Sequence, residues 1–338
     1  MTPITTAGYS NFSITDINIM FQSELEDHPA DMIKSLYVQQ PWTSGDPKRM
    51  TFDTFALPTY TRRVAENEAA PQLSITEGDT LQKEFFKFAG VWDYTIEMKT
   101  FDKEDMIQKF AKNLVDALNA NVDHELTMQI LSYANATTIT PMDVNDSHSI
   151  ATPDAVAPGS ASHTVNGGGL GNISNILSGG GALNLDNATT LIGQGQRVTV
   201  NDAGRNVRLN LNACVIPDYF PMVKKATEIF GSQLTPETSN NAMNVFRPGA
   251  PGGMTVIALK KGALNSQGVW DTTRQHFYSF MDLDLVGANK WATTGEAAVV
   301  PVSNPQAPNA LFSLMGYKFL TYGMVRWQGK MYSFATTV

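Results

Sequence analysis

The clearest pattern of hydrophobic and polar positions lies between residues 103 and 134 and is helical. No Gly or Pro interrupts it, and Asp102 precedes it as a suitable N-terminal cap. Its apolar side chains recur every three or four residues, which places them on one helix face. They are Ile107, Phe110, Leu114, Leu118, Val122, Leu126, Ile130 and Tyr133. We predict a single helix, roughly 48 Å long, within segment 99–136, with one apolar stripe.

Strand-like patterns precede this helix in segment 37–98. Prolines at 41, 47, 58 and 71 exclude helices, and strand-like pieces occupy 50–55, 59–64 and 85–96. In the last piece, Val91, Asp93 and Thr95 alternate with larger apolar side chains. We predict a long two-stranded excursion with a polar tip. Such a hairpin is marginal in water by itself, so we expect a neighbouring subunit to hold it.

The N-terminal residues 1–36 form no core of their own in this reading. They contain a short amphipathic stretch, 14–21, followed by a charged tract that ends at His28 and Pro29. We predict an arm that must pack on another surface.

Segment 137–190 is rich in Thr, Ser, Asn, Ala and Gly, which is typical of a long loop or an inserted β-rich flap. We expect His148 and His163 to lie in a flexible region. The glycine clusters 167–171 and 179–181 do not match a phosphate-binding loop, because the required Lys-Ser/Thr and strand–helix contexts are missing.

Helical and strand patterns mix in residues 187–310. Strands are predicted at 205–216, 254–259, 275–280 and 297–300, and a helix at 218–230 with Pro221 in its first turn. Segment 311–338 predicts a closing pair of strands, 317–326 and 327–334, around a turn that contains Gly329. The fold class is therefore α+β.

Composition narrows the function. The chain has 338 residues, 42% of them hydrophobic, which is enough for a sizeable core. Charged residues make up only 17%, and the formal net charge is −8, without any Lys/Arg run. Such a chain is a poor candidate for binding nucleic acid through its phosphates, although a shell of such chains could enclose nucleic acid. The N-terminus lacks the pattern of a secretory signal, and no apolar stretch is long enough to span a membrane.

Residues that could carry chemistry are few and scattered. The five histidines, His28, His124, His148, His163 and His276, show no metal-ligand spacing, and we expect His124 to be solvated or salt-bridged. Cys214 lies in an apolar strand and is expected to be a buried, inert thiol. Asp282 and Asp284 fit a turn or strand edge better than a cation site. We therefore expect no catalytic, cofactor or metal site, and no enzyme.

The order of these parts is more informative than any single motif. An arm, a long hairpin, an unusually long helix, an α/β region and closing strands resemble the HK97-fold major capsid protein of tailed bacteriophages. The passage Val207–Val223, a strand that leads through Pro217 and Tyr219 into a helix, is similar to that family's axial domain. Tyr322–Tyr332 is similar to its returning peripheral strand.

The resemblance implies these parts: an N-terminal arm (1–36), an extended loop (37–98), a spine helix (99–136), an insertion (137–190), an axial domain (187–310) and returning peripheral strands (311–338). It also implies hexamers and pentamers that tile an icosahedral shell around packaged double-stranded DNA. The implied setting is a virion assembled in the host cytoplasm, with separate scaffolding, portal and cement or decoration proteins as further partners and no cofactor.

Two other classes of protein remain open at this point: the shell of an encapsulin-like nanocompartment, and a β-rich fibre or adhesin module. Some relatives link subunits through Lys–Asn isopeptide bonds. Lys48 lies in the extended loop, but no Lys, Asn and catalytic Glu match that pattern, and we do not expect the bond.

Overall fold

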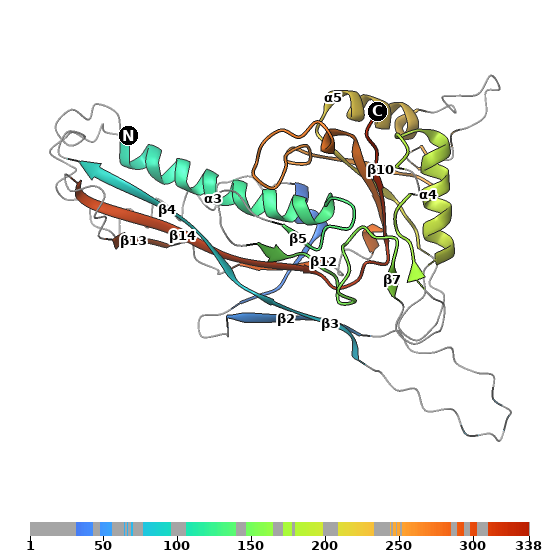
Figure 1. Ribbon diagram of the computed structural model, residues 1–338, viewed down its shortest axis with the longest axis horizontal. Coiled ribbons are helices and arrows are strands. Elements are labelled where there is room, and N and C mark those ends of the chain that lie inside the picture. Colours follow the sequence, from blue (N-terminus) through green and yellow to red (C-terminus); the bar gives the residue numbers. More distant parts are fainter. Residues whose placement is uncertain are drawn as a thin grey trace.

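The computed structural model describes residues 32–42, 48–55, 64, 66, 69, 77–95, 106–139, 147–164, 172–177, 180–198, 209–232, 244, 246–247, 249–250, 252–284, 289–293, 298–302 and 310–337. Residues 1–31 of the predicted arm (1–36), residues 59–63 of the strand predicted at 59–64 and the glycine cluster 167–171 lie outside these residues. The described elements combine two larger sheets with α-helices, as the α+β class requires (Figure 1).

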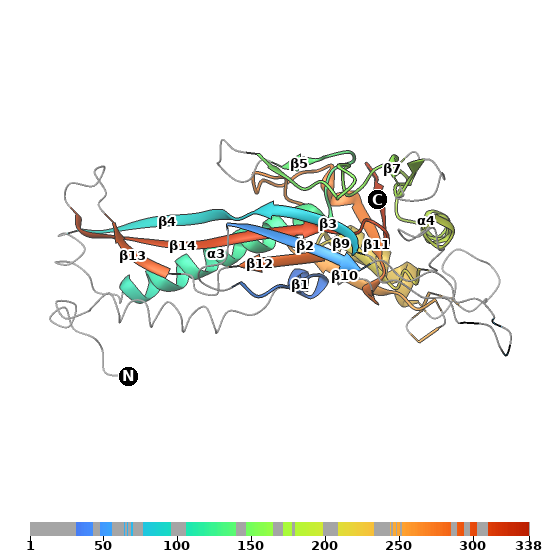
Figure 2. The same ribbon diagram turned by 90° about the horizontal axis from the view of Figure 1, so that it is seen from below.

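The first sheet is built around the long strand β14 (Ala310–Met324). One edge of β14 pairs antiparallel with β4 (Phe86–Thr95), and the other pairs with β13 (Ala298–Val302) and β12 (Asn289–Thr293). The short strand β1 (Val38–Gln39) adds to β12 in parallel. Figure 2 shows β4 and β14 running side by side along the long axis of the molecule.

The second sheet has the order β10 (Thr255–Leu259), β9 (Ala213–Pro217), β11 (Phe277–Met281) and β15 (Lys330–Phe334). Every residue of β9 and β11 is buried, because both faces of the sheet are covered. Ala213 and Val215 pack toward α3 (Met106–Ile130) and the 3₁₀ helix η2 (Met32–Leu36). Cys214 and Ile216 point the other way, into a cluster with α4 (Leu185–Val198) and α5 (Phe220–Ala226).

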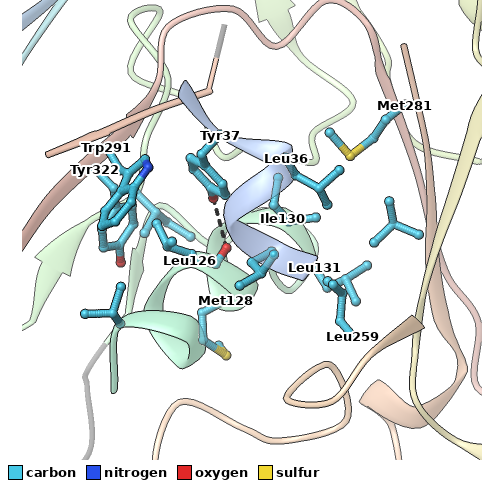
Figure 3. Close-up of a cluster of buried hydrophobic side chains, with 14 of the residues drawn as sticks. Leu36, Tyr37, Leu126, Met128, Ile130, Leu131, Leu259, Met281, Trp291 and Tyr322 are labelled. Atoms are coloured by element: carbon cyan, nitrogen blue, oxygen red, sulfur yellow. Dashed lines mark hydrogen bonds between the residues drawn. The ribbon is translucent and has the colours of Figure 1, made fainter. Parts of the chain in front are cut away.

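A shared core joins the two sheets at the C-terminal half of α3. Figure 3 shows Leu126 and Ile130 of α3 between Trp291 and Tyr322 of the first sheet and Leu259 and Met281 of the second. The Tyr37 hydroxyl lies 2.9 Å from the carbonyl oxygen of Leu126. Burial of so much apolar surface fixes η2, α3 and both sheets as one body.

Helix α3 confirms the predicted stripe, with corrections. Leu114, Leu118, Val122, Leu126 and Ile130 are all buried. The helix ends at Ile130, about 37 Å from its start, so the predicted last member, Tyr133, lies in the following turn.

The prediction of a single stripe is wrong for the second half of α3. From Val122 to Ile130 every side chain is buried, including polar ones. The periodicity of apolar residues could not predict this, because it counts apolar positions only, whereas polar side chains are buried here as well. The expectation of a solvated or salt-bridged His124 is wrong for the same reason: its ring is buried, and Nε2 contacts the carbonyl oxygen of Ser266 at 3.3 Å.

The predicted excursion is present, but its return strand was assigned wrongly. Strand β2 (Arg49–Phe55) pairs antiparallel with β3 (Glu77–Glu84), whereas the piece predicted at 85–96 is β4 and belongs to the first sheet. The sequence of β3 is mostly polar, and only Leu81 and Lys83 are half-buried among its described side chains. The sequence of β3 therefore lacks the alternation of apolar and polar residues from which a strand is predicted.

Segment 137–190 contains two small strand pairs, β5 (Thr138–Ile139) with β6 (His148–Ser149), and β7 (His163–Thr164) with β8 (Asn172–Ile173). The prediction that His163 is in a flexible region is wrong. It is fully buried, pairs with Asp154 at 2.9 Å, and stacks on Trp327 with ring centroids 4.3 Å apart.

The predicted closing strand pair is also wrong. Strand β14 belongs to the first sheet and β15 to the second, so the chain crosses between sheets instead of turning back on itself. Gly329 occupies the connection with φ 91°, a conformation that favours glycine.

Candidate assembly surfaces

The β2–β3 hairpin is attached to the body at its base. Phe52 is fully buried, and with Leu81 it packs against Gly323 of β14, where any Cβ would come within 2.6 Å of Leu81. Lys290 Nζ donates to the carbonyl oxygen of Asp53 at 2.5 Å. These contacts fix where the hairpin leaves the sheet.

The remaining described surface of the hairpin is polar and open. Thr51 and Asp53 of β2 and Thr80, Gln82 and Glu84 of β3 are exposed. A two-stranded ribbon of this kind buries too little of its own surface to be stable alone. The exposed side chains of both hairpin strands are therefore available for a contact outside the chain.

Helix α3 rests on the first sheet in a notch made by two glycines. Gly90 of β4 and Gly316 of β14 are directly paired, and Leu114 of α3 lies over both. A Cβ at Gly316 would come within 2.1 Å of the Leu114 side chain. The notch allows a close approach that side chains would prevent, and it fixes the position of the helix along the sheet.

Next to the hairpin base lies a groove of about 730 Å³. Its walls come from β3 and the start of β4 on one side, the 148–155 segment on another, and β14 beneath. Three lysines, Lys48, Lys83 and Lys87, line it together with one carboxylate, Glu84. Burial lowers the pKa of Lys83 to about 8.

A buried polar triad supports the floor of this groove. His148 Nε2 lies 2.5 Å from the Tyr322 hydroxyl and 2.9 Å from Glu125 Oε2, and Tyr322 donates to the same carboxylate oxygen at 2.8 Å. Phe86 stacks on the His148 ring at 4.6 Å. Burial, aided by the Glu125 carboxylate, holds the pKa of Tyr322 well above its usual value, so Tyr322 remains neutral and keeps donating.

An apolar patch marks the end of the molecule that carries α5. Phe220, at the start of α5, is 78% exposed, and Val269 and Trp270 of a neighbouring loop are 58% and 49% exposed. Tyr219 contacts Trp270 with ring centroids 5.9 Å apart. Clustered exposed aromatic side chains favour association with another surface.

Cys214 and Asp282, two of the residues considered for chemistry, lie in structural settings. Cys214 is buried as predicted, and burial raises the pKa of its thiol. Asp282 accepts hydrogen bonds from the backbone N–H groups of Asn210 and Asp284, which is a turn-stabilising role. Within the described residues no group of three or more His, Cys, Asp or Glu could hold a metal ion. Of the helices described, none is both long and apolar enough to cross a membrane.

The sequence analysis did not identify the groove or the triad beneath it. The walls of the groove come from segments far apart in the chain, and His148 of the triad had been assigned to a flexible region. The three lysines are also not adjacent in sequence, so no charge run indicated them.

A long sheet, a helix seated on it, a projecting hairpin and a second sheet covered on both faces define an HK97-type capsid fold, as the sequence led us to expect. The chain superposes on a chain in the capsid structure of the cyanophage P-SCSP1u with a TM-score of 0.50 and 13% identity, covering 91% of this chain and 89% of that one. The fold assignment rests on this likeness.

Other solved structures are similar at lower scores. They include the capsid of an empty GTA particle (TM-score 0.49, 10% identity, 91% of each chain) and a virus-like particle from Pyrococcus furiosus (0.46, 7%, 94% of this chain and 98% of that one). No family model and no curated protein sequence matches the chain.

Proposed function

We propose that this protein is a structural major capsid protein. Copies of it associate into hexamers and pentamers, and these tile an icosahedral shell around packaged double-stranded DNA. In this proposal the first sheet with α3 forms the peripheral domain, and the second sheet with α4 and α5 forms the axial domain. The role is structural and not catalytic.

The observation that carries the proposal is the hairpin. Its described contacts with the body are made by Phe52, Leu81, Lys83 and the Asp53 carbonyl, whereas Thr51, Asp53, Thr80, Gln82 and Glu84 are exposed. The fold adds support, since the P-SCSP1u chain that shares it belongs to a capsid. Many such contacts, each weak, hold a closed shell together through avidity.

The net charge of −8 fits a shell that encloses DNA without gripping it. The wider setting follows from the same proposal. The protein is a virion component assembled in the host cytoplasm, with separate scaffolding, portal and decoration proteins as partners.

Electron microscopy of the expressed full-length chain tests the proposal. Closed particles, or sheets and rings of hexamers, are expected, whereas a chain that stays monomeric at high concentration would contradict it. DNA in particles from infected cells supports the capsid. A co-purified enzyme cargo instead would favour the nanocompartment.

A matched variant tests the hairpin itself. Replacing residues 56–76 by a short turn between β2 and β3 should leave thermal unfolding of the single chain nearly unchanged but abolish particles. Normal particles from this variant would refute a bridging role for the hairpin.

A further inference from the structure

The groove at the hairpin base carries an unbalanced positive charge. Three lysines line it, Lys48, Lys83 and Lys87, together with one carboxylate, Glu84. Arg49 Nε already donates to that carboxylate at 2.7 Å, so the carboxylate is not free to balance the lysines. On a chain of net charge −8 the groove is therefore a locally basic site.

Two of these lysines have only weak partners. Lys83 Nζ donates to the carbonyl oxygen of Ser149 at 2.7 Å. Lys87 Nζ lies 3.7 Å from Met315 Sδ and 4.9 Å from the centroid of the Tyr317 ring. Neither ammonium group bonds to a carboxylate within the part of the chain that the structure describes. An anion would be a stronger partner for both, because hydrogen bonds between ionised groups are roughly twice as strong as neutral ones.

The groove is apolar beneath these ammonium groups. Phe86 and Tyr322 contribute aromatic rings from two strands, in edge-to-face contact at 5.7 Å, and Leu81 and Phe319 also line it. The His148 triad keeps this floor in place. The volume of about 730 Å³ falls within the range of roughly 300–1,000 Å³ that is typical of small-molecule sites.

Charge and surface together select the kind of occupant. A polyanion such as nucleic acid is disfavoured, because three lysines neutralise few phosphates and the chain as a whole is negatively charged. An uncharged apolar molecule would cover the ammonium groups without giving them a partner, which costs free energy. A molecule with an apolar body and one acidic group satisfies both the floor and the lysines.

We propose that this groove is a binding site for a small organic anion with an apolar body and one acidic group, of the kind that a medium-chain fatty acid presents. The acidic group pairs with the ammonium groups of Lys83 and Lys87, and the apolar body lies on the floor that Phe86 helps to form. Burial lowers the pKa of Lys83 to about 8, and a bound anion favours its ammonium form again. The inference goes beyond the shell function and does not depend on it.

Displacement of a fluorescent reporter, anilinonaphthalene sulfonate, from the unassembled full-length chain tests the site with three matched probes. Decanoate has the tail and the charge, decanol has the tail alone, and acetate has the charge alone. Decanoate should displace the reporter saturably and bind at least roughly tenfold more tightly than either of the others. Equal displacement by decanoate and decanol, or none by decanoate, would overturn the proposal.

Variants of the lysines locate the site. Lys83→Gln with Lys87→Gln should weaken decanoate binding roughly tenfold, which corresponds to about 1.4 kcal/mol, and leave decanol unaffected. Lys83→Arg with Lys87→Arg keeps both charges and should keep decanoate binding. Thermal unfolding shows whether each variant is folded. If the Gln pair does not fold, the comparison of probes on the parent chain and the Arg pair still decides.

Two controls lie outside the groove. Lys224→Gln with Lys260→Gln changes two exposed lysines and should leave decanoate binding unchanged. Trp270→Ala removes part of the exposed apolar patch beside α5, the other surface on which an apolar probe could bind. It should leave decanoate binding intact. If either control weakens decanoate binding as much as the groove pair does, the proposal is wrong.

These outcomes are separate from those that test the shell function, because the unassembled chain is used. A chain that forms normal particles but binds no decanoate would reject the groove site and leave the shell function standing. A chain that binds decanoate in the groove but forms no particles would support the site and reject the shell function.

Discussion

The two larger sheets differ in how their faces are covered. The second sheet is buried on both faces by its own chain, with α3 and η2 on one side and α4 and α5 on the other. The first sheet carries α3 on one face, whereas Val91 of β4 remains 51% exposed. The second sheet is covered by its own chain, whereas the first sheet has exposed surface that is available for contacts with other chains. The surfaces that stabilise the single chain and those available for assembly thus lie in different parts of the molecule.

The largest expected effect comes from the fully covered sheet. Phe280 of β11 is fully buried and packs edge-to-face on Phe230 at 5.8 Å. Phe280→Ala removes these contacts and leaves a cavity, so it should lower the free energy of unfolding by about 3–5 kcal/mol. Denaturant unfolding of the unassembled chain measures this. Val91→Ala, in the first sheet, is the control and should change the free energy of unfolding by less than about 0.5 kcal/mol. If both variants lost the same free energy of unfolding, the proposed difference between the sheets would be wrong.

A smaller effect is expected where the sheets meet. Lys330 of β15 is buried and donates to Asn289 of β12, which in turn donates to the carbonyl oxygen of Leu36 at 2.9 Å. Burial lowers the pKa of Lys330 from 10.5 to about 7. Between these values the unfolded chain binds more protons, so the stability of the folded chain is lost as pH falls from about 10.5 to about 7.

Lys330→Met removes this buried amine and should flatten that pH dependence. Near pH 7 we expect the variant to be more stable by roughly 2–3 kcal/mol, less any cost of leaving the Asn289 carbonyl unpaired. Thermal melts at several pH values provide the measurement. Lys224→Met, on the surface of α5, serves for comparison, and an unchanged pH slope in the Lys330 variant would show that this lysine is not the cause.

The smallest of the three effects concerns the notch under α3. Gly316→Val places methyl groups where Leu114 lies, so overpacking should cost about 1–3 kcal/mol. Gly193→Ala in α4 provides the opposite control, because nothing lies within 4 Å of its added Cβ, and alanine is the better helix former. Thermal unfolding compares the two. A Gly316→Val chain as stable as the parent would mean that the helix does not depend on the notch.

Local sequence patterns predicted those elements whose own side chains form the core. The stripe of α3, the alternation of β4 and the apolar run around Cys214 in β9 each carry their periodicity within a few residues. Pro221 was correctly placed in the first turn of α5. These features depend on neighbours along the chain, so a reader of the sequence could find them.

The missed features depend on neighbours far away in the chain. Strand β3 is held by Phe52 and β14, and its own residues are mostly polar or charged. Burial of Glu125 requires His148 and Tyr322, both distant in sequence. Strand β15 leaves β14 for the second sheet because β11 offers it a free edge. Neither periodicity nor composition records such pairings.

The crossing from β14 to β15 has a mechanical consequence. A single stretch of backbone, Ala310–Phe334, contributes strands to both sheets, and only residues 325–329 connect them. Tension applied at one end of the molecule is therefore transmitted to the other through covalent bonds. Among these five residues, Gly329 has a positive φ that other residues rarely adopt, so a substitution there would strain this link between the sheets.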